Sequence, residues 1–414
     1  MRQIVCLATS PWYPIPTRKQ QVMSRIPDAE ILYFDPSATI IAPLRDKHAK
    51  PLMTKYKEPP VHPQENITVY SLPPVLPFFY KKRAINRINQ KKIAKFIREK
   101  MKEHGFENPV LWVYSPVTVD LVDLVPHSAL VYDCVDRHSA YGGLMDPALV
   151  DAMELELAGK TDMTFATAEA LAERLRTAQP KTRFIPNGAN FERFAEAAKP
   201  QPVPDDLKDI PHPLFGFVGA LQSCIEYDFV EQAAKARPDW HFVWIGKEKP
   251  GVDLSALRAL PNNHFLGMKP NEQLPQYLAH FDACLNLFAK SDLSKDVSPL
   301  KFYEYLATGR PIVSTRQPDQ ILQYAPLIHI ADDAAGLRRR ARPRFVTRSR
   351  SARHSASKRD AKARGTRASR RCAMCSRSRG FFERGKTEIK GPLYQEGAGR
   401  AKQGPGEYEK TSPP

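Results

Sequence analysis

Short apolar runs separated by longer segments of mixed polarity recur along most of the chain. The runs occur at residues 4–8, 67–71, 110–114, 130–134 and 163–166, and again at 215–218, 242–245, 264–266, 283–287 and 312–314. Continuous apolar runs of this length are typical of strands that are buried on both faces of a parallel sheet. Because they alternate with helical segments, the pattern predicts an α/β protein built from βα units.

The strands fall into two groups, which predicts two Rossmann-like domains. Residues 199–213 between the groups are rich in proline and charge, as is typical of a linker. We therefore expect an N-terminal domain over residues 1–198, a linker over 199–213 and an incomplete C-terminal domain over 214–336. In open parallel sheets ligands bind at the carboxyl ends of the strands, so functional residues are expected in the loops that follow them.

One short segment of the second group carries signals for both ends of a helix. Ser298 is a suitable N-cap, and Pro299 suits the first helical position, where no backbone N–H is needed. Gly309 suits the left-handed position that ends a helix, and Pro311 prevents its continuation. The sequence therefore predicts a helix of about two and a half turns, followed directly by a strand.

A cation and a carboxylate share one face of this predicted helix. Lys301 and Glu304 are three residues apart, close to the positive end of the helix dipole. The N–H groups of Leu300 and Lys301, with the Lys301 ammonium, suit a diphosphate, and Glu304 suits a ribose diol. A nucleotide sugar offers both groups. The alternative is an ordinary solvated ion pair.

Asp296 lies eight residues before Glu304, and this spacing resembles the acidic–x7–Glu signature of retaining glycosyltransferases of the GT-B fold. Asp stands where the commoner form has Glu. Residues 299–313 resemble the Pro-Leu-Lys-x-x-Glu-Tyr-Leu-Ala-x-Gly-x-Pro-Ile-Val run of these enzymes. The resemblance is strongest with bacterial cell-surface polysaccharide glycosyltransferases, including teichuronic acid enzymes.

Other segments extend the resemblance over residues 1–336, more specifically in the second half. They are residues 185–190 with Phe194, residues 215–221, and residues 265–267 followed by 274–278. The resemblance implies two Rossmann-like domains that face each other across a cleft, a nucleotide-diphosphate sugar as donor, and retention of the anomeric configuration. It assigns Asp296 to the sugar hydroxyls and requires no enzymic nucleophile.

The phosphate-binding part departs from the family pattern. Relatives carry an Arg and a Lys after the first strand of the donor domain, where this chain has residues 220–224 without either. Gly219 allows close approach of the backbone to the phosphates, or is a plain turn glycine. Lys247 is a second candidate cation, or a surface lysine. The chain contains no Asp-x-Asp motif, so we expect neither a metal nor a cofactor.

The N-terminal half offers weaker candidates. Asp136 and His138 follow a strand where relatives place a catalytic or sugar-binding polar residue; otherwise they are satisfied loop residues. Trp12 and Arg18 belong to the loop after the first strand, which either lines the acceptor cleft or is a rigid structural loop.

The net charge of +17 is concentrated at the end of the chain. Residues 338–414 hold 23 Lys and Arg against 6 Asp and Glu, so the preceding residues are formally neutral. The folded part therefore gives no reason to expect nucleic acid as a partner. Residues 337–414 have low complexity and no periodicity, so we expect a disordered basic tail. One hypothesis is a non-native end from a shifted reading frame; the alternative is a basic arm for nucleic acid or acidic lipid.

Residues 81–102 carry ten basic side chains and one acid, with apolar residues loosely at helical spacing. Aromatic residues at 78–80 precede them. A basic amphipathic helix beside exposed aromatic residues, together over 78–102, suits an anionic membrane surface and a lipid-linked acceptor; a solvated outer helix is the alternative.

The cysteines give no disulfide framework. Cys6, Cys134 and Cys284 lie in apolar runs as core thiols, and Cys372 and Cys375 lack a second pair for zinc. With no apparent signal peptide and no apolar run of membrane length, we expect a cytoplasmic protein, in peripheral contact with the inner face of the cell membrane if the basic helix binds it.

The sequence thus predicts a metal-independent, retaining glycosyltransferase that moves a sugar from a nucleotide sugar to a saccharide or lipid-linked acceptor. Two alternatives stay open: a nucleotide-sugar epimerase of the same fold, and a nucleotide-sugar-binding protein without turnover.

Overall fold

The structure is a computed structural model of the 414-residue chain. It describes residues 1–331 apart from 15, 141, 142, 144, 292 and 293, together with residues 333 and 336. The predicted tail over 337–414, which contains Cys372 and Cys375, lies outside the described residues.

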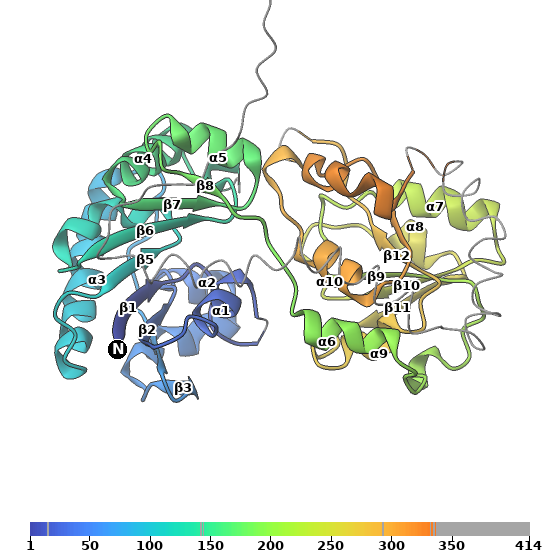
Figure 1. Cartoon of the computed structure of the whole chain (residues 1–414), viewed down its shortest axis with the longest axis horizontal. Helices are drawn as coiled ribbons and strands as arrows, with labels where there is room; N and C mark the ends of the chain where they lie inside the picture. Colours follow the sequence, from blue (N-terminus) through green and yellow to red (C-terminus); the bar gives the residue numbers. More distant parts are fainter. Residues whose placement is uncertain are drawn as a thin grey trace, which may run out of the picture.

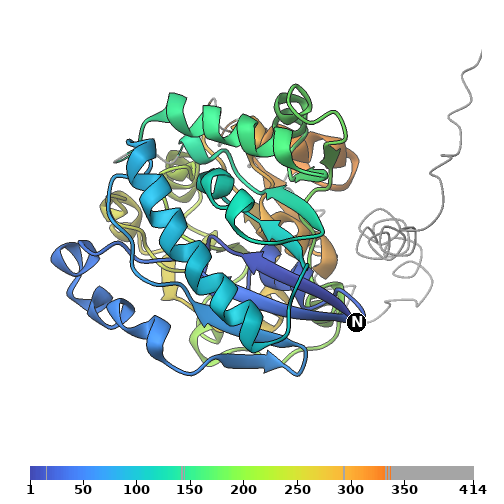
Figure 2. The same cartoon turned by 90° about the vertical axis from the view of Figure 1, so that its left-hand side faces the viewer.

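The first lobe contains an eight-stranded sheet with the order β3-β4-β2-β1-β5-β6-β7-β8, parallel except for β3 (Figure 1). Its strands are β1 (Arg2–Leu7), β2 (Ala29–Asp35), β3 (Val61–Gln64), β4 (Ile67–Ser71), β5 (Val110–Val113), β6 (Ala129–Cys134), β7 (Met163–Ala166) and β8 (Arg183–Phe184). Its helices are α1 (Arg18–Met23), α2 (Ala42–Arg45), α3 (Arg83–Glu103), α4 (Pro147–Lys160) and α5 (Glu169–Arg176). Figure 2 shows α3 lying across one face of this sheet.

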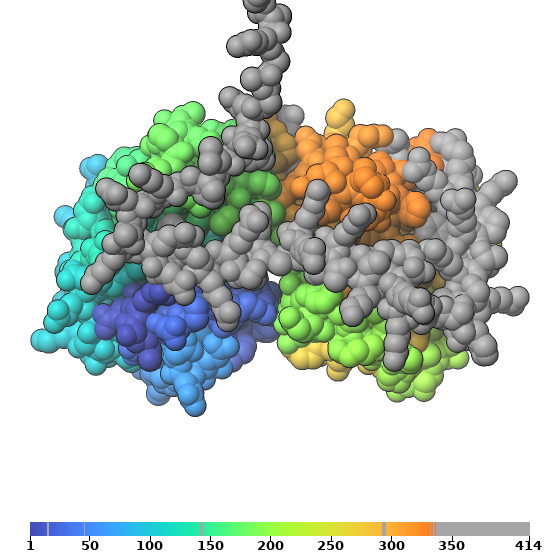
Figure 3. Space-filling model, viewed as in Figure 1, coloured from blue at the N-terminus to red at the C-terminus, as the bar shows by residue number. Residues whose placement is uncertain are grey.

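The second lobe contains a six-stranded parallel sheet with the order β11-β10-β9-β12-β13-β14. Its strands are β9 (Leu214–Val218), β10 (His241–Ile245), β11 (Asn263–Gly267), β12 (Ala283–Asn286), β13 (Ile312–Ser314) and β14 (His329–Ile330). Its helices are α6 (Phe191–Ala195), α7 (Tyr227–Ala236), α8 (Ser255–Arg258), α9 (Leu274–Leu278) and α10 (Leu300–Thr308). The two lobes are distinct in the space-filling view (Figure 3).

Each sheet is buried on both faces, because successive strand residues enter opposite hydrophobic clusters. In β1, Val5 packs into one cluster and Ile4 and Cys6 into the other. In β9, Phe217 and Val218 are divided in the same way. These strands therefore read as continuous apolar runs, and the predicted α/β fold class with two Rossmann-like sheets is confirmed. Cys6, Cys134 and Cys284 are buried free thiols, as predicted.

The segment predicted as a linker is attached to the second lobe. Leu207 is buried in the same cluster as Tyr277, and Asp206 accepts a hydrogen bond from the Tyr277 hydroxyl at 3.0 Å. Lys269 also forms an ion pair with Asp206 at 2.5 Å. The many prolines and charges of residues 199–213 thus belong to a docked connection.

Candidate functional site

Helix α10 begins at Leu300 with Pro299 as its N-cap, and it ends before Gly309, whose φ of 68° is left-handed. The predicted end is therefore confirmed, whereas the predicted N-cap at Ser298 is wrong. The Ser298 hydroxyl is engaged elsewhere, because it accepts the backbone N–H of Asn187 at 3.2 Å. The Asn187 side-chain amide donates to the Ser298 carbonyl at 2.6 Å. The loop before α10 is thus tied to the segment that connects the two lobes.

Lys301 lies in the first turn of α10, and aromatic rings enclose its ammonium. Nζ lies 3.8 Å from the centroid of the Phe217 ring and 5.0 Å from that of Phe288. Gly219 has a φ of 144°, and a Cβ at that position would lie 3.4 Å from Nζ. Burial lowers the pKa of Lys301 to about 7. The structure therefore brings Lys301 and Gly219 to one place, at the carboxyl end of β9.

Glu304 lies one turn further along α10 and lines a pocket of about 20 Å³ between the lobes. Gln21 from α1 and Arg193 from α6 line the same pocket, together with Asn271. Burial raises the pKa of Glu304 to about 7, and the Lys301 charge opposes this rise. No ion pair of 4 Å or less joins Glu304 to Lys301. The two groups predicted on one face therefore serve adjacent parts of the site.

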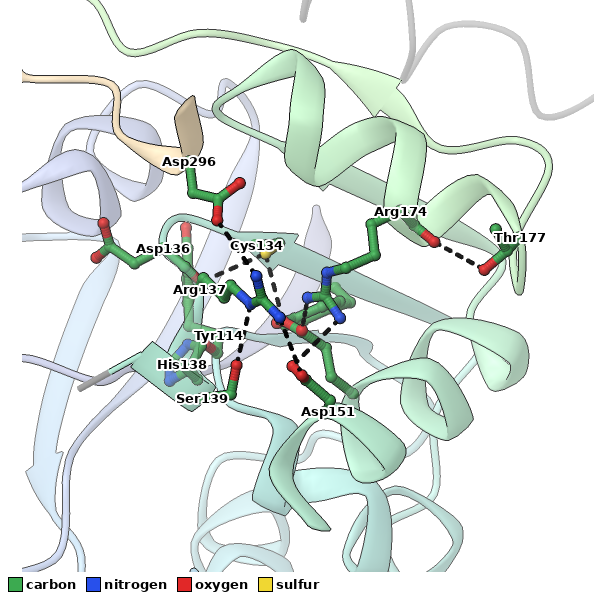
Figure 4. Close-up of polar contacts among 12 residues, drawn as sticks. Tyr114, Cys134, Asp136, Arg137, His138, Ser139, Asp151, Arg174, Thr177 and Asp296 are labelled. Carbon is green, nitrogen blue, oxygen red and sulfur yellow. Dashed lines mark hydrogen bonds and ion pairs between the residues drawn. The ribbon is translucent and has the colours of Figure 1, made fainter. Parts of the chain in front are cut away.

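Asp296 is held in a turn just before α10, facing the first lobe (Figure 4). The carboxylate is 5% exposed, and its Oδ2 lies 3.9 Å from Nη1 of Arg137, which follows β6. Oδ2 has no hydrogen-bond partner within the described part of the chain. Burial raises the pKa of Asp296, and Arg137, Lys295 and Arg174 oppose the rise. This ion pair joins the acidic position of the signature to the opposite lobe.

A charged network in the first lobe holds Arg137 in this position (Figure 4). Arg137 donates to Ser139 Oγ at 3.2 Å and to Asp151 Oδ2 at 3.2 Å. Asp151 also pairs with Arg174 at 3.5 Å, and Arg174 pairs in turn with the fully buried Glu154. Because α4 and α5 carry these partners, the Arg137 guanidinium is anchored from behind.

Asp136 and His138 flank Arg137 but have different surroundings. His138 is 2% exposed, and its Nε2 lies 3.0 Å from the carbonyl of Tyr114, to which it donates. Burial lowers the pKa of His138 to about 4, so the ring is neutral at pH 7. The carboxylate of Asp136 points away from the Arg137 guanidinium (Figure 4).

Lys19 is a buried cation that the sequence analysis did not single out. Its side chain lies in α1, and Nζ is 5.3 Å from the centroid of the Tyr114 ring. Burial lowers its pKa, and the charges of Asp136 and Asp133 oppose the shift. Arg137 was likewise not singled out, because neither residue is part of a local motif. Each gains its surroundings from residues distant in the sequence.

Of the two candidates predicted in the loop after β1, Trp12 lies in that loop and Arg18 is the first residue of α1. Trp12 is 8% exposed and packs edge-on against Tyr33, with ring centroids 4.8 Å apart. Arg18 donates to both carboxylate oxygens of the buried Asp133 at 3.1 and 3.0 Å, and to the carbonyl of Pro186 at 3.2 Å. Of the two alternatives, these contacts favour the rigid structural loop, because they fix the segment after β1 to the sheet and to the connecting segment; the acceptor-side role stays a prediction.

Of the remaining residues predicted to bind the donor, some lie at the site and one lies on the surface. Leu300 lines the pocket of Glu304, and Pro299 is buried beside it. Lys247 is exposed after β10, and its carbonyl accepts the N–H of Leu221 at 3.0 Å. Among the described residues, no three His, Cys, Asp or Glu side chains are grouped as metal ligands. Of the helices described, none has the length and apolar character that crossing a bilayer requires.

Comparison with known families and sequences identifies relatives for part of the chain. The family described as Glycosyl transferases group 1 matches residues 212–337, which include α10 and the Lys301 site. A protein of Bacillus subtilis strain 168 whose name is "Putative teichuronic acid biosynthesis glycosyltransferase TuaH" is 26% identical over 236 residues. That alignment covers 54% of this chain and 59% of the Bacillus protein.

Solved structures share the whole fold at low identity. Sucrose-phosphate synthase from Thermosynechococcus elongatus matches with a TM-score of 0.62 and 13% identity, over 92% of this chain and 98% of that chain. Anabaena HepE in complex with UDP and glucose matches with a TM-score of 0.59 and 13% identity, over 93% and 100% of the two chains. An E. coli trehalose-6-phosphate protein bound with UDP-2-fluoro glucose matches with a TM-score of 0.63 and 13% identity, over 92% of this chain and 98% of that chain. The two lobes therefore have the arrangement found in these proteins.

Proposed function

We propose that this chain, which has the GT-B fold and whose residues 212–337 form a Glycosyl transferases group 1 domain, transfers a sugar from a nucleotide-diphosphate sugar. The observation that carries the proposal is the Lys301 ammonium, enclosed by Phe217 and Phe288 beside Gly219 at the first turn of α10. The acceptor is a saccharide, either free or lipid-linked, and the product belongs to cell-surface polysaccharide. The partial similarity to TuaH supports this role.

Charge develops on the diphosphate as the glycosidic bond breaks, and the first turn of α10 is suited to stabilise it. A helix N-terminus contributes up to about 2 kcal/mol when partly buried. A cation at about 4 Å adds roughly 4 kcal/mol at an effective dielectric constant of 20. The rings around Lys301 limit its motion, so little reorganisation is needed. We propose that these groups replace a metal ion.

The other carboxylates take separate roles. Glu304, in its pocket with Arg193, accepts hydrogen bonds from the ribose diol, while Asp296 contacts hydroxyls of the transferred sugar. Oδ2 of Asp296 has no hydrogen-bond donor among the described residues, which supports the second role, because a buried carboxylate oxygen requires a donor. The acceptor attacks on the face from which the diphosphate departs, so the anomeric configuration is retained without an enzymic nucleophile.

The test is a transfer assay on the full chain. Nucleotide sugars are first screened by thermal shift, and the stabilising donor is then incubated with saccharide acceptors in the presence and absence of EDTA. We expect nucleotide release that depends on acceptor, persists in EDTA and gives a product with the donor's anomeric configuration by NMR. Binding of no nucleotide sugar would contradict the proposal, and inversion or loss of transfer in EDTA would contradict its mechanism.

A further inference from the structure

A larger cavity lies inside the first lobe, at the carboxyl ends of its strands. Its volume is about 140 Å³, and residues that follow β1, β2, β4 and β5 line it together with the first half of α3. The lining is mostly apolar and includes the buried Leu72, Val75 and Ile93, with Asn89 and Gln90 among its polar residues. An engineered apolar cavity of roughly 150 Å³ binds benzene, so about six carbon atoms fit here.

Exposed apolar side chains lie close in the chain to residues that line this cavity. Leu76 and Phe78 are 38% and 44% exposed, and each is adjacent in the chain to a lining residue, Val75 or Phe79. Ile40 is 49% exposed and donates its backbone N–H to the carbonyl of Val75 at 2.9 Å. Four residues further on, Leu44 in α2 is 86% exposed. The apolar lining of the cavity thus continues into exposed apolar side chains on two neighbouring segments, residues 40–44 and 76–78.

The backbone at Phe78 is strained in a way that keeps its ring at this surface. Its φ is 65°, a left-handed value that is an outlier for a bulky residue. Such conformations cost of order 1–3 kcal/mol and are concentrated at functional sites. The sequence analysis expected all three aromatics at 78–80 to be exposed. Instead Phe79 and Tyr80 line the cavity and are half-buried, whereas Phe78 is exposed.

Lysines accompany the apolar surface. Lys92 donates from Nζ to the carbonyl of Pro74 at 2.7 Å, directly beside the lining residue Val75. Lys55 lies 3.6 Å from Asp35, next to the lining residue Pro36. Lys81 and Lys82, which follow the lining residue Tyr80, are exposed. A mostly apolar cavity with lysines close in the chain to its lining, among them Lys55 in its ion pair with Asp35, is complementary to an amphiphile that carries an anionic group on a hydrocarbon chain.

We propose that this cavity binds the phosphate-proximal part of the hydrocarbon chain of a lipid phosphate that carries the acceptor. The inference rests on the proposed function, since it assigns the acceptor to the lipid-linked class. Ile40, Leu44, Leu76 and Phe78 enter the membrane interface, the lysines contact phosphate, and the rest of the chain stays in the bilayer. Burial of apolar surface is favourable, so a phosphate that carries a hydrocarbon chain binds more tightly than phosphate alone.

Calorimetry on the full chain tests the cavity, with decyl phosphate below its micellar concentration and inorganic phosphate as probes. We expect decyl phosphate to bind at least about tenfold more tightly than inorganic phosphate. Ser37 lines the cavity, and its Oγ is buried without a hydrogen-bond partner among the described residues. Ser37→Phe fills the cavity and should abolish the difference, whereas Ser37→Ala, the matched control, should retain it. Equal affinity for the two probes in the parent chain would overturn the proposal. Undiminished affinity of Ser37→Phe for decyl phosphate would overturn it as well.

The exposed rim provides a second test that does not disturb the interior. Vesicles of phosphatidylcholine with and without phosphatidic acid are sedimented with the parent chain and with the double variant Leu44→Asp/Phe78→Asp. We expect the parent chain to sediment with the phosphatidic acid vesicles. The double variant should bind these vesicles about tenfold more weakly. Equal retention would show that the rim does not enter the interface and would overturn the proposal. Nucleotide-sugar binding by the same variants is measured separately and reports the second lobe. Failure of the proposed function is thereby distinguished from failure of the lipid-binding proposal.

Discussion

Lys301 is the residue on which the proposed chemistry depends most. Its ammonium has two aromatic rings and Gly219 around it, and within the described part of the chain no ion pair of 4 Å or less joins it to a carboxylate. Lys301→Ala is expected to lower kcat by roughly 10²–10³, the effect of losing one preorganised charge-stabilising group. Steady-state kinetics with saturating donor measure this. Lys235→Ala, which removes an exposed lysine of α7, is the control and should keep parental kcat; parental kcat in Lys301→Ala would contradict the assignment.

The pH dependence should report Lys301 and Glu304 together. Burial lowers the pKa of Lys301 to about 7 and raises that of Glu304 to about 7. The required ammonium is lost as the pH rises above 7, and the required carboxylate is lost as the pH falls below 7. We therefore expect a narrow bell-shaped profile of kcat/KM for the donor, centred near pH 7, whose limbs belong to the coupled pair.

Substitution of Glu304 separates the two limbs. Glu304→Gln should remove the acid limb, and both Glu304→Gln and Glu304→Ala should raise the donor KM strongly, because bonds from a diol to a charged acceptor are worth about 1.5–3 kcal/mol each. Initial rates across the pH range, at donor concentrations below KM, measure both effects. A broad plateau in the parent protein would show that the two groups do not control donor binding.

Arg137 acts through Asp296 as a positioning residue. Its guanidinium opposes the rise in the Asp296 pKa that burial causes, as do Lys295 and Arg174, while Asp151 favours the rise. Arg137→Gln should raise the Asp296 pKa further and move the acid limb of the kcat profile to higher pH. Arg137→Lys should restore the limb in part, because it restores the charge without the fixed guanidinium. Loss of activity at every pH without a shifted limb would indicate a structural role alone.

At the scale of elements, Tyr305 joins α10 to β9 by hydrogen bonds. The buried Tyr305 hydroxyl accepts the N–H of Val218 at 2.8 Å and donates to the Val218 carbonyl at 3.3 Å. Tyr305→Phe leaves these backbone groups unpaired, at a cost of about 1–3 kcal/mol each for a buried group. We expect a lower urea midpoint for the second lobe and a lower kcat, since Lys301 shares this helix. Tyr56→Phe, in the first lobe, should change neither the second-lobe transition nor kcat.

Local signals predicted the elements, and contacts distant in sequence explain most errors. The apolar runs located strands such as β4, β7 and β13 at their observed bounds, because buried parallel strands are continuously apolar. The equally apolar β2 was not predicted, although its composition carries the signal. The N-cap was misplaced because Ser298 bonds to Asn187, 111 residues away.

In helix α3, the hydrophobic periodicity of the sequence likewise does not predict which side chains are buried. Its inner face carries Asn86 and Asn89, while Ile88 is 58% exposed. Periodicity alone places isoleucine inside and asparagine outside. The amides are buried because they hold loops: Asn89 exchanges hydrogen bonds with the backbone of Leu76, and Asn86 donates to the carbonyl of Val117 at 2.8 Å. Such pairings depend on the whole fold and leave no local pattern.

At the scale of the molecule, the candidate site is divided between the lobes. The residues that sequence reasoning found, Asp296, Lys301 and Glu304, lie within one short segment and could be related by spacing. Their partners Arg137 and Gln21 come from the first lobe, and only the fold brings them near. The geometry of the site therefore depends on how the lobes are held together.

The hydrogen bonds between Asn187 and Ser298 offer the most direct test of that dependence. The Asn187 amide donates to the Ser298 carbonyl at 2.6 Å, and the Asn187 backbone N–H donates to the Ser298 hydroxyl at 3.2 Å. Asn187→Ala and Ser298→Ala should each lower kcat/KM by about 10- to 100-fold, because small displacements of reacting groups are costly. As a control, Gln201→Ala removes only a bond to the Glu196 carbonyl within the second lobe and should keep parental kinetics.

The double variant decides whether the two residues act as one connection. If they do, Asn187→Ala/Ser298→Ala loses less than the combined losses of the single variants, with a coupling of about 0.5–3 kcal/mol. Hydrogen exchange of residues 185–190 should also be faster in each variant, because that segment is released from the loop before α10. Independent effects with unchanged exchange would mean that the bonds are incidental and that other contacts, such as that between Arg18 and Pro186, hold the lobes in register.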